Sequence, residues 1–558
     1  MENQKLFLYA GLAFIGLLIW QQWQLDYGPQ PIQPVVDRNN QQIQQSAQDI
    51  NSNQASDMPE LAQNTKASNF ANTANNVSNT STSLNSKTVT VETDLVKLEI
   101  DTRGGVVTSL KLKAYPVSIE DKNNLLALVY KKEDEIFLIQ SGLRSKDSVA
   151  PTHHDVYQTT ADHYEMQEGQ DELIVPLTWV KDGITVTKSY VFKRSNYLID
   201  VQHQIKNNTD KQWIGSQYRQ ITRSQPLETS NFIYTYTGAV VYNEEIKYEK
   251  VDFGDMEDEN FRLNSEGGWV AMIQHYFLSA WVPDQKENNL VYSLKNLKTY
   301  PANYTIGMRS SNQTVENQQQ YTFSSQLFVG PKLTHELEKI TKGLDLTVDY
   351  GFLTIISKPL YWLLENINAI VGNWGLAIIL LTVMIKAVFY KLSETSYRSM
   401  ARMRKVGPRL KSLKERYGDD RQKMNQAMMD LYKTEKINPM SGCLPILIQI
   451  PVFIALYWAL LESVELRHAP FMLWINDLSS KDPYYVLPLI MGISMFIQQK
   501  LNPAPPDPMQ AKVMMALPFV FTIFFAFFPS GLVLYWVVNN ILSITQQYFI
   551  TRSIESEK

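Results

Sequence analysis

The chain has 558 residues, a formal net charge of −4 and an isoelectric point near 6.1, so its charge does not favour general binding to DNA or RNA. The mean hydropathy of −0.23 resembles that of a soluble protein, but nearly all the long apolar runs lie in the C-terminal third. Cys443 is the sole cysteine, which excludes an intrachain disulfide.

The N-terminal apolar run, residues 6–20, predicts a transmembrane signal anchor over residues 1–24. Trp20 and Trp23 suit a membrane interface, and no A-x-A-like cleavage site follows, which disfavours a cleaved signal peptide. Residues 25–87 are rich in Gln, Asn, Ser and Thr. They contain too few apolar residues to form a core, which predicts a disordered polar tether.

Residues 88–340 alternate apolar and polar side chains with a period of two, which predicts one large β-sandwich. Lys181-Asp182-Gly183 is a hairpin signal within it. His153 and His154 are adjacent, but no further His or Cys lies at metal-ligand spacing. We therefore expect two solvated loop histidines and no metal site.

The helical period returns after residue 340. Residues 341–371 predict an amphipathic helix lying in the membrane interface. Residues 372–550 then predict a five-span core, and residues 551–558 a short cytoplasmic tail. Several spans are short and carry proline, so either the bundle thins the bilayer or the boundaries are misplaced. The expected spans cover about 372–392, 443–464, 484–498, 513–528 and 530–550.

Loop charges predict the orientation of these spans. Residues 391–442 carry 13 Lys and Arg against 6 Asp and Glu, which places this loop in the cytoplasm. Both termini are then cytoplasmic, and the β-rich domain lies across the membrane. With the N-terminal anchor this makes six transmembrane helices. A large exported domain without disulfides suits a Gram-negative periplasm.

Residues 393–438 predict a cytoplasmic helical hairpin with methionine on the inner stripe of each helix. One alternative is a self-packed hairpin with a solvated basic surface. The other is a docking surface, in which polarizable methionine adapts to apolar partners and basic residues contact anionic lipid or ribosomal RNA. The candidate docking residues are Met400, Met403, Arg404, Lys405, Arg409, Met424 and Met428.

Common catalytic motifs are absent from the sequence. It contains neither G-x-x-x-x-G-K-[ST] nor H-E-x-x-H, no histidine falls within a predicted span, and no span carries a pair of aspartates. We therefore expect no catalytic residues, no metal, no cofactor and no enzymatic activity.

Four long motifs in the C-terminal half resemble the YidC/Oxa/Alb family of membrane protein insertases. They are "NWGLAIILLTVMIK", "YRSMARMRKVGPRLKSLKERYGDD", "FPSGLVLYWVVNN" and the run from "NPMSGCLPILIQIPVF" to "PYYVLPLIMG". The anchor, tether and β-rich domain resemble the family's Gram-negative form. The resemblance implies a periplasmic β-supersandwich, and a five-helix core with a hydrophilic groove in the inner membrane.

The resemblance also implies the function and the partners. Such proteins insert nascent membrane proteins and, as chaperones, help them fold, alone or beside the SecYEG translocon. The implied partners are nascent membrane proteins, the ribosome, the signal recognition pathway, SecYEG with its accessory proteins, and membrane lipids.

The candidate groove residues centre on Lys386, an ammonium inside an apolar span, where a charge costs roughly 2.5–3.5 kcal/mol. The family commonly has arginine there, so the resemblance implies a groove charge, whereas snorkelling to the surface is the alternative. Thr382 lies one turn earlier on the same face, and Trp536 matches a groove aromatic of the family. Gln498 and Asn540 are weaker polar candidates. Lys391 stands where proline is expected, which predicts a straighter helix exit.

Two other functions compete with insertion. A solute transporter or channel subunit requires a repeat interface, and the spans show no internal repeat. A membrane-anchored periplasmic binding protein leaves Lys386 and the basic hairpin without a role. We therefore favour the insertase interpretation.

Overall fold

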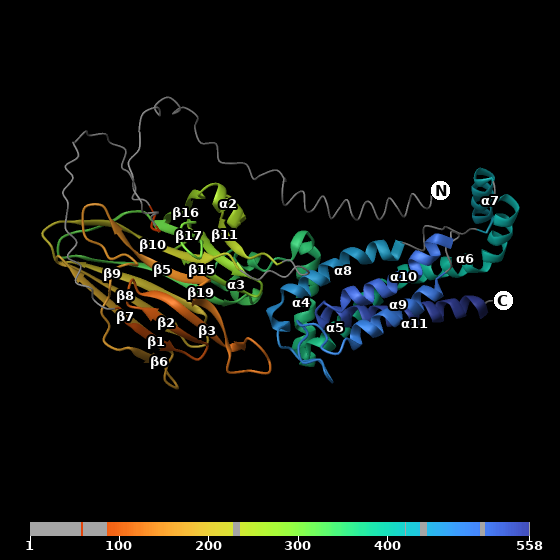
Figure 1. The fold of residues 1–558 in the computed structure, drawn as a ribbon, viewed down its shortest axis with the longest axis horizontal. Helices are drawn as coiled ribbons and strands as arrows, with labels where there is room; N and C mark the ends of the chain where they lie inside the picture. Colours follow the sequence, from red (N-terminus) through yellow and green to blue (C-terminus); the bar gives the residue numbers. More distant parts are fainter. Residues whose placement is uncertain are drawn as a thin grey trace, which may run out of the picture. The chain divides into compact units, whose positions relative to one another are not determined.

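The computed structural model describes residues 57–59, 86–226, 235–418, 420–435, 444–502 and 508–556. The predicted N-terminal anchor and nearly all of the predicted tether lie outside these residues. Element labels follow Figure 1. The described chain consists of a β-rich part followed by a helical part, as the sequence predicts.

The first of two large sheets has eleven strands, ten of them in one continuous path. Its strands pair antiparallel except for the parallel pair β1 and β6. In spatial order they are β13 (Arg262–Glu266), β16 (Asn288–Asn296), β17 (Asn303–Ser310), β10 (Trp213–Ser224), β5 (Ile136–Ser145), β4 (Leu125–Lys131), β3 (Val106–Pro116), β2 (Val96–Asp101), β1 (Thr88–Glu92) and β6 (His163–Glu165), with β18 (Gln313–Val315) on β10.

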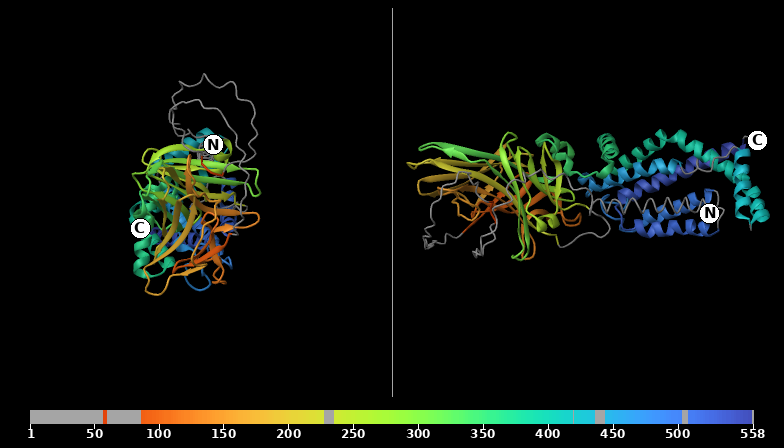
Figure 2. Two further views of the ribbon diagram at one scale, coloured as in Figure 1. Left: turned by 90° about the vertical axis from the view of Figure 1, so that its left-hand side faces the viewer. Right: turned by 90° about the horizontal axis from the view of Figure 1, so that it is seen from above.

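The second sheet has eight antiparallel strands (Figures 1 and 2). In spatial order they are β12 (Lys247–Val251), β11 (Gly238–Asn243), β14 (Trp269–Gln274), β15 (Phe277–Pro283), β19 (Gln320–Pro331), β9 (Leu198–Asn207), β8 (Ile184–Lys193) and β7 (Glu172–Lys181). One continuous hydrophobic core joins strands of both sheets, so the predicted large β-sandwich is confirmed.

The β7–β8 hairpin shows how the sequence fixes the strand register. Asp182 and Gly183 both have positive φ, 47° and 79°, as a two-residue hairpin turn with the twist of its strands requires. Lys181 pairs with Ile184 across that turn, which confirms the predicted hairpin. Exposed and buried side chains alternate along β7, so one face packs on the core and the other faces solvent.

A buried lysine fixes the turn between β2 and β3. Lys188 is fully buried, and its Nζ donates to the carbonyls of Gly104 (2.9 Å), Gly105 (2.9 Å) and Ser141 (3.1 Å). All three ammonium donors are therefore satisfied without a carboxylate. Burial lowers the pKa of Lys188 to about 7.

The loop after β5 corrects one expectation. His154 is exposed, but only 3% of His153 is accessible to solvent, so the prediction of two solvated histidines is wrong for His153. Its Nδ1 lies 2.6 Å from the hydroxyl of Tyr218, a fully buried residue of β10. The sequence separation of 65 residues hid this partner from local pattern analysis.

Helical structure is sparse until the second half of the chain. One α-helix, α4, covers the C-terminal part, residues 354–371, of the segment predicted to be an amphipathic interfacial helix, and two short 3-10 helices precede it. It buries one stripe of side chains, among them Tyr361 and Leu364, and exposes Ile355, Trp362 and Ile370. The elements up to this point are α2 (Phe253–Asp258), α3 (Thr334–Ile340), η2 (Leu344–Thr347), η3 (Gly351–Leu353) and α4 (Thr354–Val371).

The remaining helices complete the described chain, and all but α6 and α7 join α4 in a second hydrophobic core. They are α5 (Trp374–Val388), α6 (Tyr390–Tyr417), α7 (Arg421–Thr434), α8 (Leu444–Glu462), η5 (Val464–Leu466), α9 (Val486–Leu501), α10 (Pro508–Phe525) and α11 (Ser530–Ser556). Helix α11 packs against α5 and α9, while α4 packs against α5 and α8 (Figures 1 and 2). Each of the five predicted spans overlaps one of the helices α5, α8, α9, α10 and α11.

The exit of α5 is bent rather than straight. Helices α5 and α6 meet at Phe389 with a bend of 67°, so the expectation that Lys391 straightens this exit is wrong. The bend therefore forms with lysine rather than proline at position 391. By length and hydropathy, no single helix of the described chain is long and apolar enough to cross a membrane alone, whereas the bent α5–α6 pair meets that test.

A buried ion pair joins the end of the β-rich part to α8. Lys332 Nζ lies 2.9 Å from Glu462 Oε2, and their side chains are 2% and 3% exposed. Lys332 also donates to the Thr347 carbonyl at 3.1 Å, and His275 Nε2 lies 2.8 Å from the Leu461 carbonyl oxygen. These contacts hold the end of α8 against the residue after β19 and the turn between β14 and β15.

This ion pair predicts an asymmetric response to mutation. Lys332→Met leaves Glu462 buried without its partner and should destabilise the protein by about 3–5 kcal/mol, whereas Lys332→Met combined with Glu462→Leu should recover most of that loss. Thermal unfolding of the purified, detergent-solubilised chain compares the stabilities of the single and double variants. The exposed pair Lys247–Glu244 is the control, since Lys247→Met should change stability by less than about 1 kcal/mol. Equal unfolding midpoints for the single and double variants would contradict this account.

Candidate functional site

Lys386 lies in the last turn of α5, and only 6% of its surface is exposed. Helix α5 begins at Asn373, whose side chain accepts a hydrogen bond from the Leu376 amide and donates to the Phe471 carbonyl. At the other end of the helix, the Lys386 side chain points inward, toward α8 and α11.

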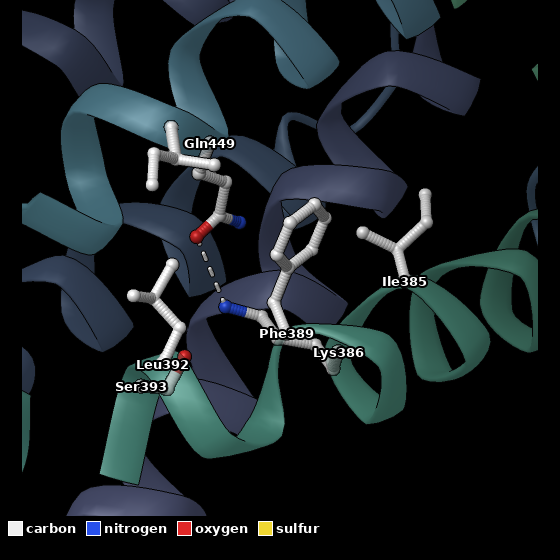
Figure 3. Close-up of a pocket in the computed structure, with 7 residues that line it drawn as sticks. Ile385, Lys386, Phe389, Leu392, Ser393 and Gln449 are labelled. Atoms are coloured by element: carbon white, nitrogen blue, oxygen red, sulfur yellow. Dashed lines mark hydrogen bonds between the residues drawn. The ribbon is translucent and has the colours of Figure 1, made fainter. Parts of the chain in front are cut away.

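Two neutral side chains hold the ammonium. Lys386 Nζ donates to Ser543 Oγ of α11 at 2.8 Å and to Gln449 Oε1 of α8 at 3.3 Å. The Gln449 amide nitrogen in turn donates to Asn539 Oδ1 of α11. Three helices therefore meet in one polar network, and in Figure 3 the lysine nitrogen points at the Gln449 side chain.

The contacts described for the Lys386 ammonium are both to neutral groups. Among the described residues no carboxylate lies within ion-pair distance of the Lys386 ammonium. An ammonium has three donors, and these two contacts use two of them. Among the described residues, one donor is therefore left without an acceptor.

The network opens on one side into a small pocket between α5, the start of α6 and α8. Gln449 and Ser393 supply its polar groups besides the ammonium, and the rest is apolar. The described lining residues are Ile385, Lys386, Phe389, Leu392, Ser393, Ile448 and Gln449 (Figure 3). The pocket therefore combines one ammonium and two neutral polar groups with apolar walls.

The other predicted groove residues lie near this network rather than in the pocket. Thr382 is buried and donates to the Ile378 carbonyl at 2.6 Å. Asn540 is buried and donates to Ser494 Oγ of α9 at 3.0 Å. Trp536 packs in an aromatic cluster with Phe453 and Phe525, and Gln498 is half-buried on α9.

Sequence analysis missed Gln449, Asn539 and Ser543. A signal for Ser543 was present, because Trp536, Asn540, Ser543 and Gln547 recur every three or four residues and mark one face of α11. Asn540, Ser543 and Gln547 are each no more than 4% exposed. Gln449 is the one amide in the apolar run of α8, which also marks it as unusual.

The predicted docking residues fall into two groups. Met403 and Met428 pack around buried Val406 and Tyr432 between α6 and α7, and Met400 and Met424 are half-buried. Arg404, Lys405 and Arg409 are exposed, although Lys405 donates to the Ile554 carbonyl at 3.2 Å and Arg409 pairs with Glu435. The basic residues, rather than the two packed methionines, therefore form the accessible surface.

Comparison with known proteins identifies the family. The model of the YidC periplasmic domain matches residues 88–363, and that of the 60Kd inner membrane protein matches residues 366–557. A "Membrane protein insertase YidC" of Methylococcus capsulatus is 51% identical over 559 aligned positions, covering 100% of this chain and 99% of the relative. The chain belongs to the YidC family of membrane protein insertases.

Further matches agree with this assignment. The insertase of the same name from Nitrosococcus oceani is 49% identical, and the alignment covers 100% of both chains. The crystal structure of an active YidC insertase covers 83% of this chain and 92% of its own, at 17% identity and a TM-score of 0.39, too low for a structural conclusion. The names of the two relatives support the insertase interpretation over a solute transporter or channel subunit.

Proposed function

We propose that this chain inserts and helps fold membrane proteins, and that the Lys386 pocket receives the polar flank of an incoming client. The observation that carries the proposal is the buried ammonium held by Ser543 and Gln449, with no carboxylate partner among the described residues. A charge in a low-dielectric setting attracts an opposite charge more strongly than the same charge in water.

The hydrophobic segment of the client supplies the driving force. Moving apolar surface out of water yields about 25 cal/mol per Å². The lysine lowers the barrier for the client's acidic tail, which must leave water before it crosses. No nucleotide, metal or enzymatic step is required in this scheme.

The proposed topology has six spans, with the N-terminal anchor and helices α5, α8, α9, α10 and α11 as its members. The excess of basic residues over 391–442 supports a cytoplasmic α6–α7 segment and cytoplasmic termini. The sandwich would then lie in the periplasm of a Gram-negative cell, as the matched periplasmic-domain model supports.

The proposed partners divide between the two faces of the membrane. The exposed basic residues of α6 and α7 suit an anionic partner, such as ribosomal RNA or lipid headgroups. Nascent chains delivered by the ribosome or the signal recognition pathway would reach the Lys386 pocket from this side. We place cooperation with SecYEG and its accessory proteins in the membrane.

Substitution of Lys386 tests the electrostatic role. Lys386→Arg should retain insertion, Lys386→Glu should abolish it, and Lys386→Ala should impair mainly clients with acidic tails. The measurement is protease protection of one client that carries zero, one or two acidic residues in its translocated tail. The Ala defect should grow with each added acidic residue, because each one loses an attraction to the ammonium.

Lys391 provides the matched control. It is an exposed lysine a few residues further along the chain, so Lys391→Ala removes the same charge without touching the network. This variant should insert all three clients normally. A Lys386→Ala defect that does not change with tail charge would exclude the electrostatic role.

Truncation of the α6–α7 segment tests recruitment. Ala401 packs with Ile550 and Ile554 of α11, so the deletion must begin beyond Lys405 to preserve that contact. Replacing residues 408–434 with a short Gly-Ser linker should abolish co-translational insertion and leave the thermal unfolding of the remainder nearly unchanged. Normal insertion rates in this variant would show that the segment is only a spacer.

A further inference from the structure

Three potential metal ligands converge on the β-sandwich, far from the Lys386 pocket in sequence. Asp57 Oδ2 lies 3.1 Å from His153 Nε2 and 3.1 Å from His154 Nε2. One ligand atom from each residue lies within 4.8 Å of the others. The ligands come from two segments separated by 96 residues, so only the folded chain brings them together.

The buried histidine is oriented by a second contact. Its Nδ1 lies 2.6 Å from the Tyr218 hydroxyl, which also accepts the His153 backbone N–H at 2.9 Å. Metal-binding histidines commonly use their second ring nitrogen in this way, since it fixes the ring and leaves the other nitrogen for the ion. Burial lowers the pKa of His153, which favours the neutral imidazole that a metal requires.

The loop that carries both histidines is fixed by its neighbours. Gly104, at φ 73°, donates its N–H to the Asp155 carbonyl at 2.6 Å. A Cβ at Gly104 would lie 2.2 Å from the His153 carbonyl oxygen, so only glycine permits this close approach. The Asp155 carboxylate accepts hydrogen bonds from the amide and hydroxyl of Thr152, both at 2.8 Å. The histidines are thus presented by a rigid support.

The segment that carries Asp57 has its own contacts with the sandwich. The Asp57 carbonyl accepts a hydrogen bond from Gln220 Nε2 at 3.0 Å, and Pro59 is buried. The position of the carboxylate therefore does not depend on the histidines alone.

We propose that Asp57, His153 and His154 form a Zn²⁺ site that fastens residues 57–59 to the β-sandwich. A tetrahedral ion with bonds of about 2.0 Å places its ligand atoms about 3.3 Å apart, close to the two 3.1 Å separations. Two imidazoles and one carboxylate suit Zn²⁺, whereas Mg²⁺ and Ca²⁺ favour oxygen ligands alone. Water takes the fourth position.

The competing explanation is an ion pair without a metal. The Asp57 carboxylate raises the pKa of His154, so a proton on that ring can serve as the counterion. Zinc would displace this proton. The two explanations therefore predict different metal contents and different effects of replacing the Asp57, His153 or His154 side chain.

The experiment uses the full-length, detergent-solubilised chain with a non-histidine affinity tag. The protein is stripped with a chelator, dialysed against Zn²⁺ and analysed for bound metal, and its Zn²⁺ affinity is measured by calorimetry. Co²⁺ substitution reports tetrahedral coordination through its visible absorption. The variants are Asp57→Asn, His153→Gln and His154→Gln. The control is His163→Gln, which removes an exposed histidine of the same sandwich.

We expect one Zn²⁺ per chain in the unmodified protein and in His163→Gln, with an apparent Kd at least tenfold higher in each ligand variant. Because His153 is buried, its variant can misfold. The Asp57→Asn and His154→Gln variants are therefore the ones that test the proposal. Zinc content and affinity unchanged in either of these two variants, or absence of zinc from the unmodified chain, would overturn the proposal.

Discussion

A buried ammonium with only neutral partners among the described residues is the constraint that ties together helices α5, α8 and α11. Lys386 needs acceptors, and Ser543 and Gln449 provide them from two other helices. Each partner is neutral, so the protein provides hydrogen bonds to the ammonium without neutralising its positive charge. This arrangement limits the loss of hydration and preserves an electric field that a carboxylate partner would remove.

The same constraint explains which parts of the site the sequence could reveal. A lysine within an apolar run is conspicuous, and so Lys386 could be selected directly. Its partners lie 63 and 157 residues away in the sequence. A single Gln or Ser in a helix does not indicate which residue it contacts. The three- and four-residue spacing of polar groups on α11 indicates which face of the helix is buried. It does not indicate which other helix packs against that face.

The fold could be predicted further than the site. Period-two alternation and the Asp182-Gly183 turn act locally, so they indicated strands and a hairpin correctly. The order of strands across the two sheets depends on contacts distant in sequence. For example, β10 lies between β5 and β17 and supplies Tyr218 to His153. That non-local pairing is why His153 is buried, contrary to the expectation from its loop sequence.

The choice of lysine rather than arginine has a consequence for how a ligand is held. A guanidinium presents five donors in a planar fork, which suits bidentate binding of a carboxylate but demands more acceptors when buried. The ammonium needs only three, and its two neutral contacts among the described residues leave one unused. A single remaining donor gives a weaker and less directional grip. In the proposed mechanism a client enters and then leaves sideways into lipid. A weak point-charge attraction would then favour release as well as entry, whereas a fully paired carboxylate would tend to remain bound.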